Sequence, residues 1–92
     1  MRALGVMALA LGIAIGVAPP AAAGEDEYLG KLRARYVYLN DDQLLTEAHK
    51  VCQMTLSGHP TPDAIPMVIK DLAISVSVAV EIISTAVDEF GC

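Results

Sequence analysis

The stretch from Asn40 to Gly58, NDDQLLTEAHKVCQMTLSG, constrains the fold most, because it carries a helical pattern with both of its ends marked. Its apolar residues recur at steps of one, three or four positions, as on one side of an α-helix. They are Leu44, Leu45, Ala48, Val51, Cys52 and Leu56. Asn40 and Gln43 have the spacing of a capping box, and Gly58 is suited to turn the chain. We therefore predict one amphipathic helix, with other helices packed on it and Cys52 on its buried face.

The first 23 residues have the features of a signal peptide. Arg2 precedes an unbroken apolar run over residues 3–17, two prolines follow, and residues 21–23 are alanines. As an uncleaved anchor this run is too short, because a membrane-spanning helix needs ~20 residues. We predict cleavage between Ala23 and Gly24, which makes the protein an exported one and leaves a single mature domain, residues 24–92.

The charge of the mature domain limits its partners. Loss of Arg2 moves the formal net charge from −5 to about −6, since every acidic residue follows the predicted cleavage site. A negative domain lacks the basic face that nucleic-acid phosphates need, and anionic lipid does not attract it. We therefore expect no nucleic-acid partner. Because cleavage removes the short apolar run, we also expect no stable transmembrane span in the mature domain.

Cys52 and Cys92 are the only two cysteines, and they lie 40 residues apart. In an exported chain they allow one intramolecular disulfide, and such a link suits a domain too small to bury much surface. A redox motif would place the two sulfurs close in sequence, and a metal site would need further ligands. We predict a structural disulfide between Cys52 and Cys92.

The segment before the central stretch predicts a first helix. Tyr28, Leu29, Leu32 and Tyr36 recur at helical steps, and Asp26 is a candidate cap. Residues 37–39 are expected to form a short extended connector. Tyr36 and Tyr38 are open to two interpretations, an aromatic binding patch or the more common sealing of a small core.

The segment after it predicts two more helices. Thr61 is a candidate cap with Pro62 behind it, although Pro66 favours a first ordered helical turn that begins nearer to itself. Residues 74–90 show both strand-like alternation and helical spacing, and we favour a helix because a lone strand has no partner. Ser75 and Gly91 mark its ends. The surplus of valines at 76, 78, 80 and 87 is either buried on several sides or left exposed as a partner or lipid surface.

No residue pattern predicts catalysis, a metal or a cofactor. His49 and His59 lack the accompanying ligands of a zinc motif, and Asn40, Asp41 and Asp42 lack the spacing of a calcium loop. Ser57 lacks the glycine elbow of a nucleophile, and no glycine-rich phosphate loop is present. We expect a protein that is not an enzyme.

The order of these features resembles domain of unknown function 732, a family of small exported actinobacterial, mostly mycobacterial, proteins. The similar segments are Tyr28-Leu29 with Leu32, the stretch Ala48–Cys52, Gly58 followed by Thr61-Pro62-Asp63, Ile74-Ser75, and the series Ala79, Ile82, Ile83, Ala86, Phe90 before Cys92. Two departures are Tyr36-Val37, where the family often has Gly-Ile, and Gly91, which separates Phe90 from Cys92. The resemblance implies an exported, disulfide-bonded helical domain and supplies no catalytic residue.

We predict an all-α fold, a small bundle of about four short helices with one disulfide. The function expected is that of a non-enzymatic secreted or cell-envelope protein that binds a protein or other envelope partner through its helical surface. The alternative is a carrier of a small apolar ligand, haem or lipid, held between the helices. That carrier would use His49, His59, Tyr36 or Tyr38 as polar contacts.

Overall fold

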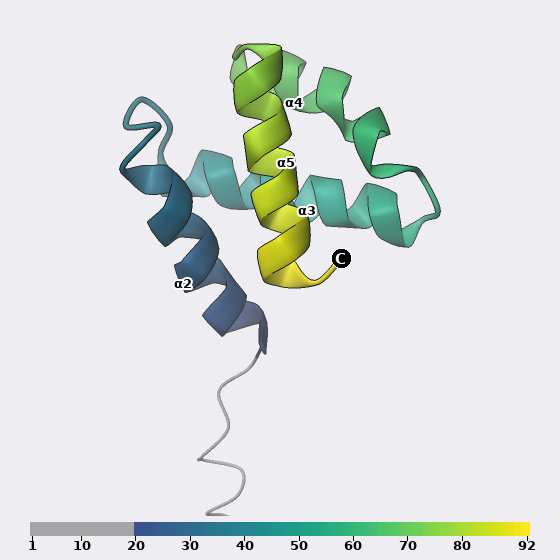
Figure 1. The fold of residues 1–92 in the computed structure, drawn as a ribbon, viewed down its shortest axis with the longest axis horizontal. Coiled ribbons are helices and arrows are strands. Elements are labelled where there is room, and N and C mark those ends of the chain that lie inside the picture. Colours follow the sequence, from purple (N-terminus) through teal and green to yellow (C-terminus); the bar gives the residue numbers. More distant parts are fainter. Residues whose placement is uncertain (1–19) are drawn as a thin grey trace, which may run out of the picture.

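The computed structural model describes residues 20–92, and within that range the chain forms α-helices and no β-strand (Figure 1). In chain order these are α2 (Pro20–Arg33), α3 (Asp41–Leu56), the short 3₁₀ helix η1 (Thr61–Ala64), α4 (Ile65–Leu72) and α5 (Val76–Phe90). The predicted all-α class, with about four short helices and one disulfide, is confirmed.

The predicted signal peptide falls mostly outside the described residues. Its last four residues, Pro20 to Ala23, open α2, so the Ala23–Gly24 bond lies inside that helix in the uncleaved chain. Cleavage at this bond stays a prediction.

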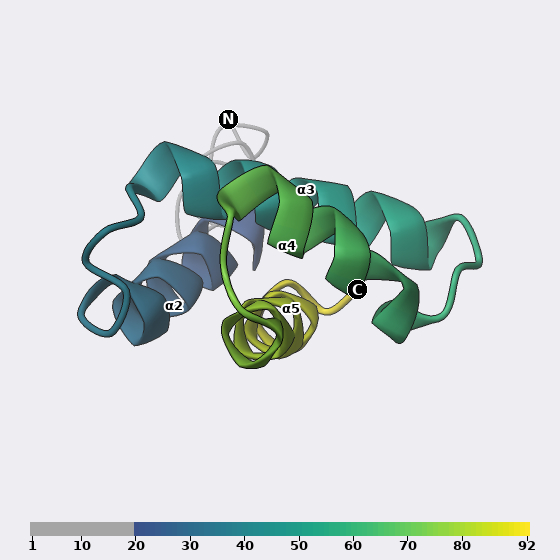
Figure 2. The same ribbon diagram turned by 90° about the horizontal axis from the view of Figure 1, so that it is seen from above.

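Helices α3 and α5 organise the bundle together. Each of them contacts α2, η1, α4 and the other. Figure 1 shows α5 crossing α3, and Figure 2 shows α3 and α4 on one side of the molecule with α2 and α5 on the other. The sequence predicted the central place of α3. Helix α5 is equally central, because it contacts the same number of elements.

Helix α3 begins where the capping box predicts. Asn40 Oδ1 accepts a hydrogen bond from the Gln43 backbone N–H at 2.8 Å, and Gln43 Oε1 accepts one from the Asn40 N–H at 2.9 Å. The chain turns away at Gly58, whose φ of +95° suits glycine. Of the predicted apolar stripe, Leu44, Ala48 and Val51 are buried. Cys52 is half-buried rather than buried, and Leu56 is 78% exposed, which corrects its predicted burial, since it is the last residue of the helix.

Helix α2 and the connector after it differ from their predictions. The helix starts before Asp26, so this residue lies within it and does not cap it. The connector folds as a turn, in which the Leu39 N–H donates to the Tyr36 carbonyl at 3.0 Å, and is not extended. Tyr36 packs partly against the core, but Tyr38 is 63% exposed and does not seal it.

The next segment confirms the influence of Pro66. A 3₁₀ turn over Thr61–Ala64 precedes α4, which begins at Ile65, immediately before that proline. Thr61 is already the first residue of η1 and the cap position belongs to Pro60, so the predicted capping role of Thr61 is wrong.

Residues 76–90 are helical, as favoured. The Ser75 hydroxyl accepts a hydrogen bond from the Val78 N–H at 3.3 Å, and Gly91, with a φ of +70°, ends the helix. The surplus valines divide between the two interpretations: Val78 and Val87 are half-buried, whereas Val76 and Val80 are exposed.

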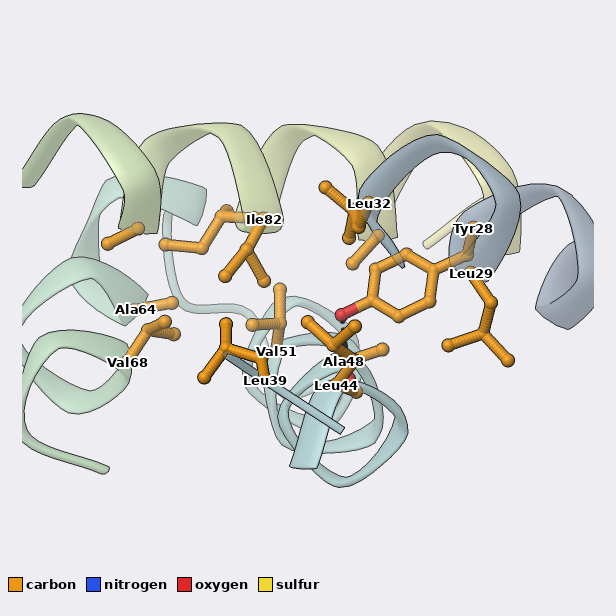
Figure 3. Close-up of a cluster of buried hydrophobic side chains, with 13 residues drawn as sticks. Tyr28, Leu29, Leu32, Leu39, Leu44, Ala48, Val51, Ala64, Val68 and Ile82 are labelled. Atoms are coloured by element: carbon orange, nitrogen blue, oxygen red, sulfur yellow. Dashed lines mark hydrogen bonds between the residues drawn. The ribbon is translucent and has the colours of Figure 1, made fainter. Parts of the chain in front are cut away.

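The core lies where the helices meet, and Tyr28 is its largest fully buried side chain (Figure 3). Its hydroxyl donates a hydrogen bond of 2.6 Å to the Leu44 carbonyl, which ties α2 to α3. Its ring packs edge-on against Phe90 with ring centroids 5.4 Å apart. Burial raises the pKa of the Tyr28 hydroxyl well above its usual range, so this side chain stays a neutral donor.

Candidate functional site

The predicted disulfide is present and fixes the end of the chain. Cys52, on α3, and Cys92, the last residue, are bonded with their Cα atoms 5.4 Å apart. The turn at Gly91 brings Cys92 back toward α3 after α5 ends. Neither cysteine is therefore a free thiol.

An apolar pocket of about 180 Å³ lies between η1, α4 and α5. Its lining is formed by Thr61, Pro62, Ile65, Val80, Ile83 and Ser84. Val80 is 43% exposed, and Val76, one turn earlier on the same helix, is 58% exposed. We call Val76, Val80 and this pocket the α5 apolar face. It offers apolar surface to a partner, and its polar groups are limited to hydroxyls.

The buried face of α3 carries a carboxyl, that of Glu47, which was not predicted. Glu47 is only 3% exposed, and its Oε1 has no hydrogen-bond donor within the described residues. Its Oε2 lies 3.9 Å from Lys50 Nζ, which is itself 2.5 Å from Asp71 Oδ2 on α4. Burial, together with the neighbouring Asp71 carboxyl, raises the pKa of Glu47 to about 7. Such shifts mark active sites and structural ion networks alike, and this network joins α3 to α4.

The sequence contained a signal for Glu47. Leu44, Glu47, Ala48 and Val51 stand at positions i, i+3, i+4 and i+7, which places the carboxyl on the buried face of α3. The predicted apolar stripe of α3 did not include Glu47, because it was defined by apolar residues alone. A shallow pocket of about 250 Å³ opens beside it, lined by Asp42, Gln43, Thr46, Glu47, Asp71 and Leu72.

The four polar residues named for a haem or lipid carrier lie in three separate places. Tyr36 and Tyr38 stack edge-on in the connector, and the Tyr36 hydroxyl donates to Glu81 at 2.6 Å. His49 is exposed on α3, with its ring 6.0 Å from that of Phe90. His59 lines a third pocket with Lys50, Gln53, Met54, Ser57 and Met67. None of the four lines the apolar pocket of about 180 Å³.

Residues 20–92 were searched for two further features, a metal-binding group and a membrane-spanning helix. Within this range, no group of three histidine, cysteine or acidic side chains is placed to hold a metal ion. None of the helices in the described part of the chain has both the length and the apolarity to cross a bilayer. The candidate binding site is the α5 apolar face, because exposed valines lie beside an apolar pocket there.

Comparison of the chain with protein-family models, with curated proteins and with solved structures finds no match.

Proposed function

We propose that this chain is an exported, non-enzymatic protein that binds a protein partner of the cell envelope or the secreted medium through the α5 apolar face. The observation that carries the proposal is the exposure of Val76 and Val80 beside an apolar pocket. Large aliphatic side chains that remain exposed next to a hollow are typical of contact surfaces. Of the four surplus valines in this helix, Val76 and Val80 are the two that folding leaves exposed.

Two further features support export. The Cys52–Cys92 disulfide fits an oxidising compartment, where such bonds form and persist. The predicted signal peptide, with its cut between Ala23 and Gly24, and the resemblance to domain of unknown function 732 point the same way. The intact mass of the exported form tests both features together, because it reports the cleavage site and the loss of two hydrogens to the disulfide.

Site-specific photocrosslinking in the source cell tests the contact surface. A photoreactive residue at position 80 is expected to give a discrete protein adduct, while the same residue at Glu27, exposed on α2, gives none. Adding Val76→Asp to the position-80 variant should abolish the adduct, because a charge one turn away disfavours apolar docking. Equal adducts at both positions, or none at position 80, would contradict the proposal.

A carrier of a small apolar ligand is the second candidate, and the apolar lining of the same pocket favours it. The volume of about 180 Å³ suits an alkyl segment rather than a whole lipid, since drug-sized ligands occupy ~300 Å³ or more. Native mass spectrometry of protein purified from the source envelope distinguishes the two functions. A co-purifying mass that Val80→Asp removes would identify a carrier, and its absence would rule out the lipid version. The haem version is tested by titrating the oxidised domain with haem, and the absence of a Soret shift would rule it out.

A further inference from the structure

Both methionines of the mature domain line one pocket. Of the four methionines in the chain, Met1 and Met7 precede the predicted cleavage site, and Met54 and Met67 follow it. Met54 belongs to α3 and Met67 to α4, yet they share a hollow of about 320 Å³ with His59. Both are half-buried and packed against the edge of the core. Both residues therefore contact the core and line the pocket.

The end of α3 brings the histidine to this pocket. The chain reverses at Gly58, and the His59 backbone N–H donates to the Met54 carbonyl at 3.0 Å. This bond holds the residue that follows the turn against the last turn of the helix. The 3₁₀ turn of η1 then leads into α4, which packs against α3 and places Met67 on the same pocket. A chain reversal thus gathers three ligand-type residues that are not adjacent in sequence.

The three side chains share one kind of coordination chemistry. Methionine thioethers are soft, neutral ligands, and imidazole suits the same metals, among them copper. Zinc, calcium and magnesium favour the thiolate, imidazole or oxygen sets that residues 20–92 do not assemble. The stronger soft ligand, a free cysteine thiolate, is absent because Cys52 and Cys92 are bonded to each other. The residues that line the pocket therefore include two methionines and a histidine, and no cysteine thiol competes with them.

The surrounding charges are compatible with a monovalent cation. Lys50 also lines the pocket, but its ammonium is paired with Asp71 at 2.5 Å and lies 3.9 Å from Glu47. Asp63 Oδ2 lies 3.9 Å from His59 Nδ1, beyond hydrogen-bond distance, and adds a negative charge beside the histidine. The chain as a whole carries a net negative charge of −5.

We propose that Met54, Met67 and His59 form a binding site for a soft monovalent metal ion, Cu(I), with Ag(I) as its redox-inert analogue. This site lies away from the α5 apolar face and does not depend on the protein-binding function. Metal binding needs the two thioethers to converge on one ion, which the three rotatable bonds of each methionine permit. A purely structural role would require only apolar volume at positions 54 and 67, which leucine supplies as well.

Titration of the oxidised mature domain with Ag(I), in a chloride-free buffer, tests the site. Native mass spectrometry is expected to show one ion per chain, and the methyl NMR signals of Met54 and Met67 should both shift on binding. The double variant Met54→Leu/Met67→Leu keeps the apolar volume and should bind Ag(I) more weakly by about tenfold or more. Cu(I), kept reduced with ascorbate, should likewise bind the wild-type domain more tightly than the double leucine variant.

Histidine variants provide the matched control. His59→Gln is expected to weaken Ag(I) binding, whereas His49→Gln, which alters the exposed histidine outside the pocket, should leave it unchanged. Circular dichroism of each variant establishes that it is folded. The proposal is overturned if the wild-type domain takes up no Ag(I), if the double leucine variant binds as tightly as wild type, or if only one methionine methyl shifts.

Discussion

Cys92 is bonded to Cys52 across 40 residues of sequence, so the segment that follows α5 is fixed to α3 about one turn before that helix ends. The bond closes a loop that contains the end of α3, η1, α4 and all of α5. Phe90, two residues before the bond, packs edge-on against Tyr28 of α2 and against His49 of α3. The disulfide therefore holds α5 in the position from which it contacts the other helices.

Removal of the disulfide is expected to destabilise the domain severely. In the loop-entropy account, a bond that closes 40 residues stabilises the native state by about 4 kcal/mol. That is a large share of the ~5–15 kcal/mol by which domains are stable. Thermal denaturation should show a much lower Tm for Cys52→Ala/Cys92→Ala and for the reduced wild type. An unchanged Tm in both would contradict this.

The two glycines of α2 are expected to respond to alanine in opposite directions. A Cβ built at Gly24 would lie 2.6 Å from the Glu89 carbonyl oxygen, so Gly24→Ala forces α2 and α5 apart. Overpacking of this kind costs about 1–3 kcal/mol of unfolding free energy. Gly30 has nothing within 4 Å of such a Cβ, and Gly30→Ala should stabilise the helix by up to ~1 kcal/mol. Urea denaturation of the two variants, made in the same chain, measures the contrast. Equal midpoints would show that α2 does not pack at Gly24 as described.

The Tyr28 hydroxyl is expected to contribute to stability independently of its ring. Tyr28→Phe keeps the edge-on contact with Phe90 but removes the 2.6 Å hydrogen bond to the Leu44 carbonyl. The loss should be about 1 kcal/mol of unfolding free energy. Tyr38→Phe alters an exposed hydroxyl and serves as the matched control, with an expected change near zero. If both variants lost the same amount, the buried hydrogen bond would not be the cause.

The sequence predicted those features that depend on neighbouring residues. The capping box of Asn40 and Gln43, the cap at Ser75 and the stop at Gly91 are local backbone chemistry, and all three are confirmed. The disulfide was predictable for a different reason, because two cysteines allow a single pairing.

The features that were missed depend on where helices begin and end and on tertiary packing. Leu56 continues the apolar stripe of α3 but stands at the helix end, where it remains exposed, and Asp26 lost its capping role because α2 begins upstream. The hydrogen bond from Tyr36 to Glu81 and the pocket shared by Met54 and Met67 join segments that no local pattern relates. Such sites become visible only when the helices are placed in space.

Glu47 is the group through which pH is expected to act on stability. Its pKa is raised from an ordinary value of 4.5 to about 7, first by burial and then by the Asp71 carboxyl, while Lys50 opposes the shift. Hydrogen bonding from Lys50 lowers the pKa of Asp71, so that residue titrates below this range. The Tyr28 hydroxyl, whose pKa burial raises, titrates above it. Among the groups of this network, Glu47 is therefore the one that titrates between pH 4.5 and about pH 7.

Between these two pH values the folded state keeps the Glu47 proton that the unfolded state has released, so stability falls as the pH rises from about 4.5 to about 7. The total loss is about 3 kcal/mol, at ~1.4 kcal/mol per pKa unit.

Glu47→Gln keeps the shape without the charge, and its amide N–H can donate to Asp71. The variant should match wild type near pH 4.5 and exceed its unfolding free energy by about 2–3 kcal/mol at pH 8. Urea denaturation across this range measures the difference, with Glu27→Gln, an exposed change on α2, as the control that follows wild type. A Glu47→Gln variant whose stability runs parallel to wild type at every pH would show that folding does not raise the pKa of this carboxyl.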